Sequence, residues 1–354
     1  MTTRPLGFGI VGLGMIARFH ALALEAMRDA ELVACYSRDQ GKADTFAAEH
    51  GGTGYGDMEV FLAHPGLDVV IICTPSGAHL EPTLAAAKAG KHVVCEKPLE
   101  VTTARIDEMI ATCDAAGVLL AGIFPRRFNP ATALLKAAVE DGRFGRINLA
   151  DAYVKWWRTQ DYYDSGAWRG TWALDGGGAL MNQSIHTIDL LLHVMGDAKS
   201  VRAETRLVAH EGIEVEDTAV AMLEFATGAL GVIQGTTASW SADGHPAEVQ
   251  ITGSDGSAFL SDDKFRVWEF REAREDDARI LREFALGAGA EGAGAADPSS
   301  IDFRWHQRNL EDVVSALREG RPSLVNGPEA RRSVALIEAI YQSASAGGEK
   351  VEVG

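Results

Sequence analysis

Three polar side chains recur at helical spacing within the segment GGGALMNQSIHTID (176–189). Asn182, His186 and Asp189 stand at i, i+4 and i+7, so on a helix they share one face. An imidazole whose pKa lies near neutrality can accept and return a proton. The pattern therefore predicts a helix that presents a reactive stripe to a cleft, with the glycines letting backbone pass close to a ligand. A histidine satisfied within the core is the alternative.

A second reactive group stands at the end of an expected strand, HVVCEKP (92–98). Ligands bind at the carboxyl ends of strands in doubly wound sheets, so we expect Lys97 at the mouth of such a sheet. Its ammonium can hold and polarise a substrate hydroxyl. Pro98 stiffens the backbone after the lysine, and a cis bond there would be a deliberate constraint. The alternative is a surface lysine paired with Glu96, but the position favours the first interpretation.

A glycine loop stands near the beginning of the chain, in GIVGLGMIA (9–17), between an expected strand and an expected helix. In this GxGxxA pattern Gly12 permits a tight turn and Gly14 lets the backbone approach a pyrophosphate. The following helix begins at Met15 and Ile16, and its N–H groups and dipole favour phosphates. The loop therefore predicts a dinucleotide site, with a merely structural turn as the alternative.

The end of the second expected strand, CYSRD (35–39), bears on the choice of dinucleotide. An acid there would bind the 2′-hydroxyl of NAD, but Ser37 and Arg38 stand in its place. A guanidinium can meet the 2′-phosphate of NADP, with the serine adding a hydrogen bond. Asp39 would permit NAD if the loop is shifted, and an ordinary solvated charge is the alternative for Arg38. The residues favour NADP over NAD.

Residues 150–175 hold four of the seven tryptophans and three of the six tyrosines, with basic residues between them. Aromatic faces stack on sugar C–H surfaces, while arginines bind carboxylate or phosphate. Trp172 and Arg169, nearest to the glycine triplet, are the candidates for substrate binding, and Arg127 ends the fifth expected strand near the same cleft. A well-packed strand and loop is the alternative. The basic groups are compatible with an acidic sugar or a nucleotide sugar.

The elements that position these groups follow from the periodicity of the chain. Residues 6–122 alternate apolar strands with helices, which indicates a parallel sheet covered on both faces. After about residue 124, long period-two runs joined by glycine turns indicate a mostly antiparallel sheet. A chain of 354 residues favours two domains. We therefore expect an α/β fold with a Rossmann domain over 1–124 and a second domain with a large open sheet over 125–354, whose last helix, 327–346, packs back on the first.

Composition narrows the class of partner and the compartment. The formal net charge of −17 argues against nucleic acid and against anionic membranes. The chain shows no membrane-spanning apolar run, no signal-peptide pattern and no zinc-type cysteine spacing. We expect a cytoplasmic protein with reduced thiols and no metal. The Gly/Ala-rich stretch 287–300 is expected to be a flexible loop.

The sequence resembles the glucose–fructose oxidoreductase/inositol dehydrogenase/MocA family (Gfo/Idh/MocA) along essentially the whole chain. The resemblance rests on GIVGLGMIA, ICTPSGAH (72–79), CEKPL and GGGALMNQSIHTIDLL, together with FPRRFNP (124–130) and GPEARRSVALIEAIY. The glycine loop is shared by many dehydrogenases. The EKP motif followed by GGG-x-L-x-(D/N)-x-x-x-H-x-x-D is far more specific.

The resemblance implies an oxidoreductase that uses NAD(P) on a secondary alcohol or carbonyl of a sugar, cyclitol or sugar derivative. It also implies a homodimer or homotetramer formed through the open sheet. Lys97 matches the EKP lysine, His186 matches the catalytic histidine, and Asn182 falls where many members have aspartate. By the same motifs the further cofactor-binding residues are Thr74, Pro75, His79, Glu96, Lys97 and Pro98.

The asparagine at position 182 changes the expected chemistry. Asn182 cannot accept a proton, so its amide positions a substrate hydroxyl or fixes His186. Proton transfer should fall on His186 with Lys97 assisting, and Asn182→Asp should change the pH profile of activity. Asp189, in a supporting position, can bond the imidazole, cap backbone or pair with an arginine.

Two other functions remain open from the sequence. The fold also suits a non-catalytic regulator that senses NAD(P), although retention of Lys97 and His186 counts against it. An enzyme that uses NAD transiently to cleave or rearrange a glycoside is the third.

Overall fold

The computed structural model describes residues 4–242, 244–286 and 302–354, so the Gly/Ala-rich stretch lies outside the described residues. The chain divides into two compact units. The first contains Met1–Pro125 and Asp302–Arg331, and the second contains Arg126–Ile301 and Arg332–Gly354. The chain therefore leaves the first unit after Pro125 and returns to it near the C-terminus.

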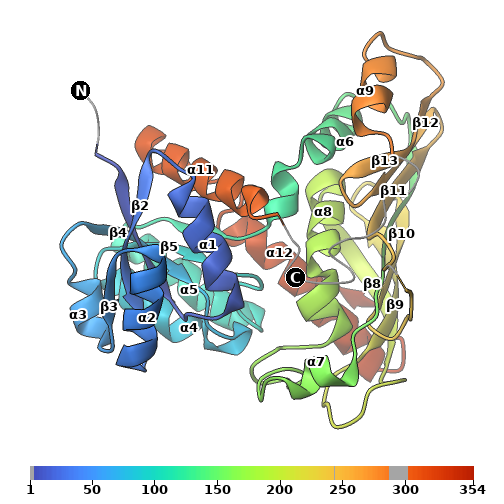
Figure 1. The fold of residues 1–354 in the computed structure, drawn as a ribbon. Helices are drawn as coiled ribbons and strands as arrows, with labels where there is room; N and C mark the ends of the chain where they lie inside the picture. Colours follow the sequence, from blue (N-terminus) through green and yellow to red (C-terminus); the bar gives the residue numbers. More distant parts are fainter. Residues whose placement is uncertain (1–3, 243, 287–301) are drawn as a thin grey trace. The chain divides into compact units, whose positions relative to one another are not determined.

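A six-stranded sheet with the order β3-β2-β1-β4-β5-β6 forms the centre of the first unit (Figure 1). Each neighbouring pair is parallel, as predicted from strands that are apolar on both faces. The order reverses between β1 and β4, which is where doubly wound sheets bind ligands. The strands are β1 (Leu6–Val11), β2 (Ala30–Tyr36), β3 (Thr53–Tyr55), β4 (Leu67–Ile72), β5 (His92–Cys95) and β6 (Leu120–Gly122).

Helices follow the strands of this sheet. Polar side chains cap their first turns: Asp39 accepts a hydrogen bond from the backbone of Lys42, and Thr102 accepts one from Arg105. The helices are α1 (Met15–Glu25), α2 (Gln40–His50), α3 (Met58–Leu62), η1 (Ser76–Ala78), α4 (Leu80–Lys88), α5 (Thr103–Ala116), α11 (Arg304–Glu319) and the first turn of α12 (Gly327–Ser345).

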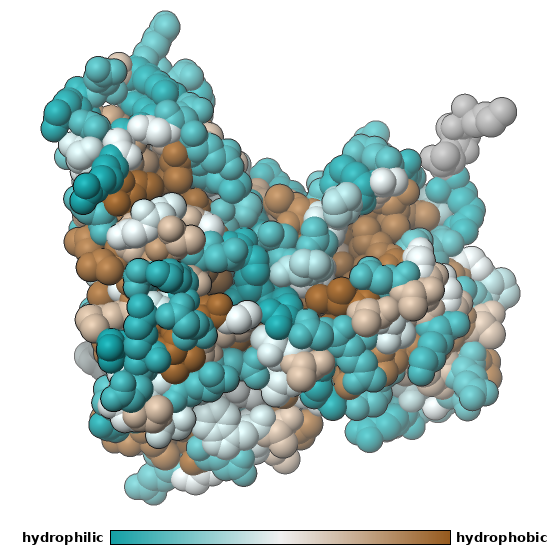
Figure 2. All heavy atoms as spheres, turned by 180° about the vertical axis from the view of Figure 1, so that it is seen from behind, coloured by the Kyte–Doolittle hydropathy of each residue, from teal (hydrophilic) through white to brown (hydrophobic). Residues whose placement is uncertain are grey.

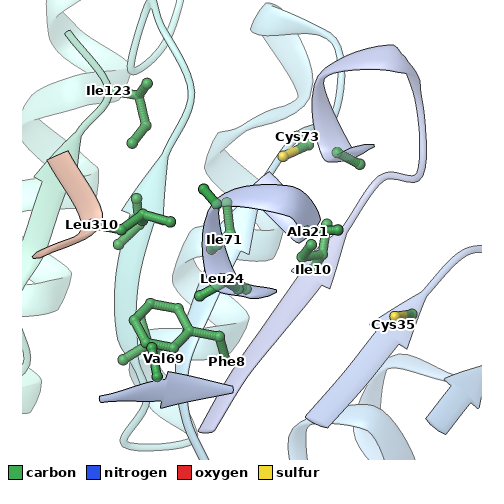
Figure 3. Close-up of a cluster of buried hydrophobic side chains, with 14 of the residues drawn as sticks. Phe8, Ile10, Ala21, Leu24, Cys35, Val69, Ile71, Cys73, Ile123 and Leu310 are labelled. Carbon is green, nitrogen blue, oxygen red and sulfur yellow. The ribbon is translucent and has the colours of Figure 1, made fainter. Parts of the chain in front are cut away.

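A hydrophobic core joins β1 and β4 to the two helices α1 and α11, which lie side by side (Figures 1 and 3). Leu310 of α11 and Leu24 of α1 point into this core beside Phe8. Each such side chain contributes roughly 1.5–3 kcal/mol when buried. This burial explains why α11 belongs to the first unit, although it follows the second unit in sequence. Cys35 also lies in the core, and burial raises the pKa of its thiol to about 12.

The second unit is built on an eight-stranded sheet with the order β13-β12-β11-β7-β10-β9-β8-β14. Its neighbours are antiparallel except β7 and β10, which pair in parallel. Glycine turns at ATGA (226–229) and GSDG (253–256) join β9 to β10 and β11 to β12, which confirms the mostly antiparallel sheet. The strands are β7 (Ile147–Lys155), β8 (Ala198–Arg206), β9 (Thr218–Phe225), β10 (Leu230–Thr236), β11 (Glu248–Gly253), β12 (Gly256–Ser261), β13 (Lys264–Phe270) and β14 (Val351–Glu352).

Helices cover one face of this sheet, and α8 packs against β7 and β11 (Figure 1). Along β9 the residues alternate between buried and exposed, so Val220 and Met222 lie on the other face. Figure 2 shows apolar surface between polar side chains on this unit, seen from behind. The helices are α6 (Pro130–Glu140), α7 (Gln160–Asp164), η3 (Ala179–Ser184), α8 (Ile185–Met195), α9 (Asp277–Phe284) and the remainder of α12.

Candidate active site

The glycine loop joins β1 to α1 at the switch point of the first sheet. Gly12 has φ +88°, and a Cβ there would lie 2.8 Å from backbone atoms of Cys73 and Thr74. A Cβ on Gly14 would meet no atom within 4 Å, and the helix that starts there has no side-chain cap. Gly12 is thus required by the fold, whereas Gly14 leaves open the space that a pyrophosphate needs. The loop fits a dinucleotide. Met15, half exposed, and Ile16, partly buried, form the first turn beside it.

The loop after β4 is tied to the segment after Lys97 by a buried histidine. His79 Nδ1 lies 2.9 Å from the carbonyl oxygen of Pro98, and Nε2 lies 2.8 Å from that of Thr74. Carbonyl oxygens only accept, so each ring nitrogen can hydrogen-bond there only as a donor. The structure thus brings Thr74, His79 and Pro98 together, with the partly exposed Pro75 next to Thr74. His79 therefore links the loop after β4 to the segment after Lys97 through its two ring nitrogens.

Glu96 is buried and contacts α1. Its Oε1 lies 2.8 Å from Nε2 of His20, and its Oε2 accepts the backbone N–H of Lys97 at 3.1 Å. Burial acts to raise the pKa of Glu96, but the hydrogen bond from His20 and the electrostatic interactions with His20, His306 and Lys97 together outweigh it and lower the pKa to about 2. The carboxylate therefore holds the backbone beside Lys97. The Lys97–Pro98 bond is cis, and Lys97 is partly exposed.

A second histidine completes this buried cluster. The ring of His306, on α11, lies edge-on to His20 with centroids 5.4 Å apart. Burial, followed by the charge of His20, lowers the pKa of His306 to about 4. The sequence analysis missed both histidines. The available signal for His20 was a histidine within an apolar helical pattern, whereas His306 stands far away in the chain.

At the end of β2 the side chains take separate roles. Asp39 caps α2 by accepting the backbone N–H of Lys42 at 3.2 Å, and the hydroxyl of Ser37 accepts the backbone N–H of Asp39 at 3.2 Å. Arg38 is exposed. The carboxylate that would permit NAD is therefore engaged as a helix cap.

The glycine triplet precedes the predicted polar helix in the second unit. A Cβ on Gly178 would overlap the carbonyl oxygen of Glu216, and one on Gly177 would overlap the hydroxyl of Tyr341. The prediction that these glycines make room for a ligand therefore needs correction. Gly177 and Gly178 are required because other parts of the same unit pack directly against their backbone.

The polar helix begins with a π-helical stretch, η3, which continues into α8. Wider π turns are frequent at functional sites. Between residues 179 and 195, Asn182 and His186 are the two side chains that are not buried. The helix therefore exposes two members of the predicted stripe on an otherwise buried surface.

Asp189, the third member of the stripe, is buried and paired with an arginine. Arg127 donates from Nε to one carboxylate oxygen at 2.8 Å and from Nη2 to the other at 2.7 Å. Of the three roles considered for Asp189, the structure shows this one. Arg127 is itself buried, so the geometry assigns its guanidinium to holding α8. Its predicted role in substrate binding has no support from this placement.

Asn182 belongs to a hydrogen-bonded cluster. Its Nδ2 donates to Asp175, and its Oδ1 accepts from Nε2 of Gln183 at 2.8 Å. Gln183 Oε1 accepts from Arg158 at 2.9 Å, and its Nε2 also donates to the hydroxyl of Tyr162 at 2.9 Å. The sequence analysis singled out Asn182 but none of these partners.

The two predicted substrate-binding residues of the aromatic segment lie in the second unit. The guanidinium of Arg169 stacks over the rings of Tyr162 and Trp168, 4.3 and 4.7 Å from their centres. Within the described part of the chain no carboxylate forms an ion pair with Arg169. Trp172 is 46% exposed and meets Tyr341 edge-on at 5.1 Å. Stacking on these two rings thus orients the guanidinium.

A buried carboxyl supports the beginning of the polar helix. Glu216 accepts the backbone N–H groups of Gly178 and Leu180 at 3.0 and 2.9 Å and the hydroxyl of Tyr341 at 3.0 Å. Burial, only partly offset by these bonds, raises its pKa to about 7. The sequence analysis missed Glu216.

Two kinds of site are absent from the residues that the structure describes. No group of three or more His, Cys, Asp or Glu side chains is arranged to hold a metal ion. No described helix has both the length and the apolar character needed to cross a membrane.

The fold and the glycine loop define a dinucleotide-binding oxidoreductase class with a Rossmann unit and an open-sheet unit. Comparison with known families gives the same result. Residues 6–123 match the family model described as "Oxidoreductase family, NAD-binding Rossmann fold", and residues 132–259 match "GFO/IDH/MocA C-terminal domain". The chain belongs to the GFO/IDH/MocA oxidoreductase family, as the motifs predicted.

Relatives cover nearly the whole chain. It is 31% identical to myo-inositol 2-dehydrogenase of Thermotoga maritima over 93% of both proteins. It is 27% identical to levoglucosan dehydrogenase of Pseudarthrobacter phenanthrenivorans over 96% of both. Among solved structures, the WlbA dehydrogenase from Bordetella pertussis, in complex with NADH and UDP-GlcNAcA, superimposes with a TM-score of 0.87 at 33% identity, covering 99% of each chain.

Proposed function

We propose that this protein is an NAD(P)-dependent dehydrogenase that oxidises a secondary alcohol of a sugar, cyclitol or sugar derivative, or reduces the corresponding ketone. The observation that carries the proposal is the surface of η3 and α8, where Asn182 and His186 emerge from a helix that is otherwise buried. Membership of an NAD-binding oxidoreductase family supports the redox class.

In the proposed reaction His186 removes the hydroxyl proton and Lys97 holds and polarises the same oxygen. The bound nicotinamide supplies the hydride acceptor, and the protein supplies orientation. Two buried hydrogen-bonded pairs of side chains support these groups. Glu96 with His20 fixes the backbone at Lys97, and Arg127 with Asp189 fixes the helix turn after His186.

The finer substrate class follows from Arg169 and Trp172. An aromatic face can stack on a sugar ring, and a guanidinium without a carboxylate partner can bind an acidic group. The structural relative crystallised with UDP-GlcNAcA supports a substrate that carries carboxylate or diphosphate. We therefore place an acidic sugar or a nucleotide sugar ahead of a neutral cyclitol.

The cofactor preference is proposed from the end of β2. Ser37 and the exposed Arg38 follow β2 and could together bind a 2′-phosphate, whereas Asp39 is engaged as a helix cap. We therefore propose that the protein prefers NADP to NAD. Met15, Ile16, Thr74, Pro75 and His79 form the remainder of the proposed cofactor surface.

We also propose separate roles for the two parts of the chain and a homo-oligomeric state. The Rossmann part, 1–124, binds the dinucleotide, and the part from 125 onward binds substrate and oligomerises. The face of the large sheet opposite α8 exposes Val220, Met222 and Leu230, which supports a homodimer or homotetramer formed through this face. The cytoplasm is the proposed compartment.

One experiment tests the function. Fluorescence titration with NADH and NADPH identifies the cofactor, and a panel of polyols, sugars, sugar acids and nucleotide sugars then identifies the substrate. We expect Lys97→Ala and His186→Ala each to lose nearly all turnover while still binding the cofactor, and His186→Ala to bind it with parental affinity. Arg169→Gln should raise KM for acidic substrates selectively.

Three results would contradict the proposal in different ways. Full turnover by either Ala variant would remove the catalytic assignment. Cofactor binding without turnover of any panel compound would favour a sensing regulator. A tightly held NAD that is never consumed, while a glycoside is cleaved or rearranged, would favour transient oxidation.

A further inference from the structure

We propose that Asp175 is a positioning residue that holds the amide of Asn182 in one orientation through a directed chain of hydrogen bonds. The inference rests on the proposed function, because Asn182 stands one helix turn before His186 on the exposed stripe. Asp175 immediately precedes the glycine triplet, and its carboxylate is buried. The chain of bonds runs within the second unit alone.

The chain begins at a group that can only donate. The guanidinium of Arg158 donates from Nη2 to Oε1 of Gln183 at 2.9 Å, and it has no acceptor atom. Gln183 must therefore direct its oxygen to Arg158 and its Nε2 away from it. This Nε2 donates to Oδ1 of Asn182 at 2.8 Å and to the hydroxyl of Tyr162 at 2.9 Å. The arginine thus decides which way the glutamine amide points.

The chain ends at a group that, when ionised, can only accept. Because Oδ1 of Asn182 receives the bond from Gln183, its Nδ2 must donate, and it donates to Oδ1 of Asp175. The other oxygen of Asp175 accepts the backbone N–H of Gly170 at 2.8 Å. Donor-only and acceptor-only groups at the two ends therefore fix both amides between them. If the amide of Asn182 were flipped, its Nδ2 would face Nε2 of Gln183, and its Oδ1 would face the carboxylate of Asp175, so both hydrogen bonds would be lost.

This direction accounts for an amide at position 182. A carboxylate there would meet the carboxylate of Asp175, and two like charges in contact raise the pKa of one of them. Exchange of the two residues would restore every bond. The new amide at position 175 would accept from Gly170 and donate to the new carboxylate at position 182, whose oxygens would accept from Gln183 and Tyr162. Positions 175 and 182 are therefore coupled as one amide and one carboxylate.

The test compares Asp175→Asn, Asn182→Asp and the double exchange Asp175→Asn/Asn182→Asp in the full chain. Asn148→Asp is the matched control, because Asn148 is an exposed amide whose oxygen accepts from the hydroxyl of Thr252 and keeps that bond as a carboxylate. Charged and titratable groups near the cluster stay unchanged in all four variants; they include Arg158, Arg169, Glu216, Tyr162, Tyr341 and His186. Each variant is measured for kcat and KM against pH, for NADH affinity and for unfolding by urea against pH.

We expect each single variant at positions 175 and 182 to lower kcat about tenfold or more, and the double exchange to recover at least about tenfold over the product of the two singles. Asn182→Asp should also shift the pH profile, since its paired carboxylates share a proton. NADH affinity should stay within about twofold of the parent throughout, and the control should match the parent. A double exchange that shows only the product of the single losses would overturn the proposal.

The unfolding measurement separates this proposal from the proposed function. A pair that shares a proton has a raised pKa, so Asn182→Asp should lose stability as the pH rises, and the double exchange should abolish that slope. We expect this pH dependence of unfolding even if no compound of the substrate panel is turned over. In that case the proposed function would be wrong, and the hydrogen-bonded chain would still stand. The stabilities of the variants at positions 175 and 182 could be coupled while the pH profile of kcat stays unchanged. This result would show that Asp175 has only a structural role and would refute the positioning role.

Discussion

The two glycines of the dinucleotide loop should respond oppositely to the same substitution. Gly12→Ala adds a methyl group where backbone atoms of Cys73 and Thr74 lie 2.8 Å away, on a residue with φ +88°. The left-handed backbone costs about 1–2 kcal/mol for an L-residue. Relieving the overlap costs a further ~1–3 kcal/mol. We therefore expect a loss of roughly 2–5 kcal/mol, a large part of the 5–15 kcal/mol that stabilises a typical protein.

Gly14→Ala should leave the fold intact and weaken cofactor binding. Gly14 has φ −89° and ψ −163°, which alanine adopts, and its Cβ would meet no protein atom within 4 Å. The free energy of unfolding should change by no more than about 1 kcal/mol. The methyl group would occupy the space where the pyrophosphate approaches, so NADH affinity should fall about tenfold or more.

Urea unfolding followed by tryptophan fluorescence measures the first effect, and NADH fluorescence titration measures the second. The two variants control for each other, because they add the same methyl group to the same loop. Parental stability of Gly12→Ala would refute the assignment of backbone crowding. Parental NADH affinity of Gly14→Ala would show that the pyrophosphate does not lie at this glycine.

Two further predictions concern buried charges. The pKa of His306 in the folded protein, about 4, lies below its ordinary value of 6.5. The unfolded chain therefore binds this proton at a higher pH than the folded protein does. The free energy of unfolding should fall by up to roughly 3 kcal/mol as the pH drops from 6.5 towards 4. His306→Phe should flatten this slope in urea titrations at several pH values; an unchanged slope would assign it to other groups. Arg127→Ala should cost ~3–5 kcal/mol because it leaves the buried carboxylate of Asp189 without its partner. Arg4→Ala, which breaks the exposed ion pair with Asp68, should cost far less, and equal losses would contradict the burial argument.

Local patterns in the sequence predicted the elements and several reactive groups. The alternation of apolar strands and helices predicted the parallel sheet, and the glycine turns predicted the hairpins of the larger sheet. The spacing of Asn182 and His186 predicted a shared helical face, and these two side chains are the ones between residues 179 and 195 that are only partly buried. These inferences succeeded because periodicity and turn chemistry act over a few neighbouring residues.

The surroundings of those groups could not be obtained in this way. The partner of Glu96 is His20, far earlier in the chain, and the partner of Asp189 is Arg127. The reason for glycine at positions 177 and 178 also differs from the one expected, since Tyr341 and Glu216 pack against them. Each of these contacts joins segments that are distant in sequence, and no local pattern records which segments will meet.

The sequence by itself determined the two-part α/β architecture, the dinucleotide loop and the helix that bears Asn182 and His186. Only the tertiary structure decided which polar groups are buried, which atoms they bond, and therefore which carry shifted pKa values. The difference has a physical origin. Secondary structure follows from short-range backbone geometry, whereas the direction of the hydrogen bonds between Arg158 and Asp175 depends on groups that folding alone brings together.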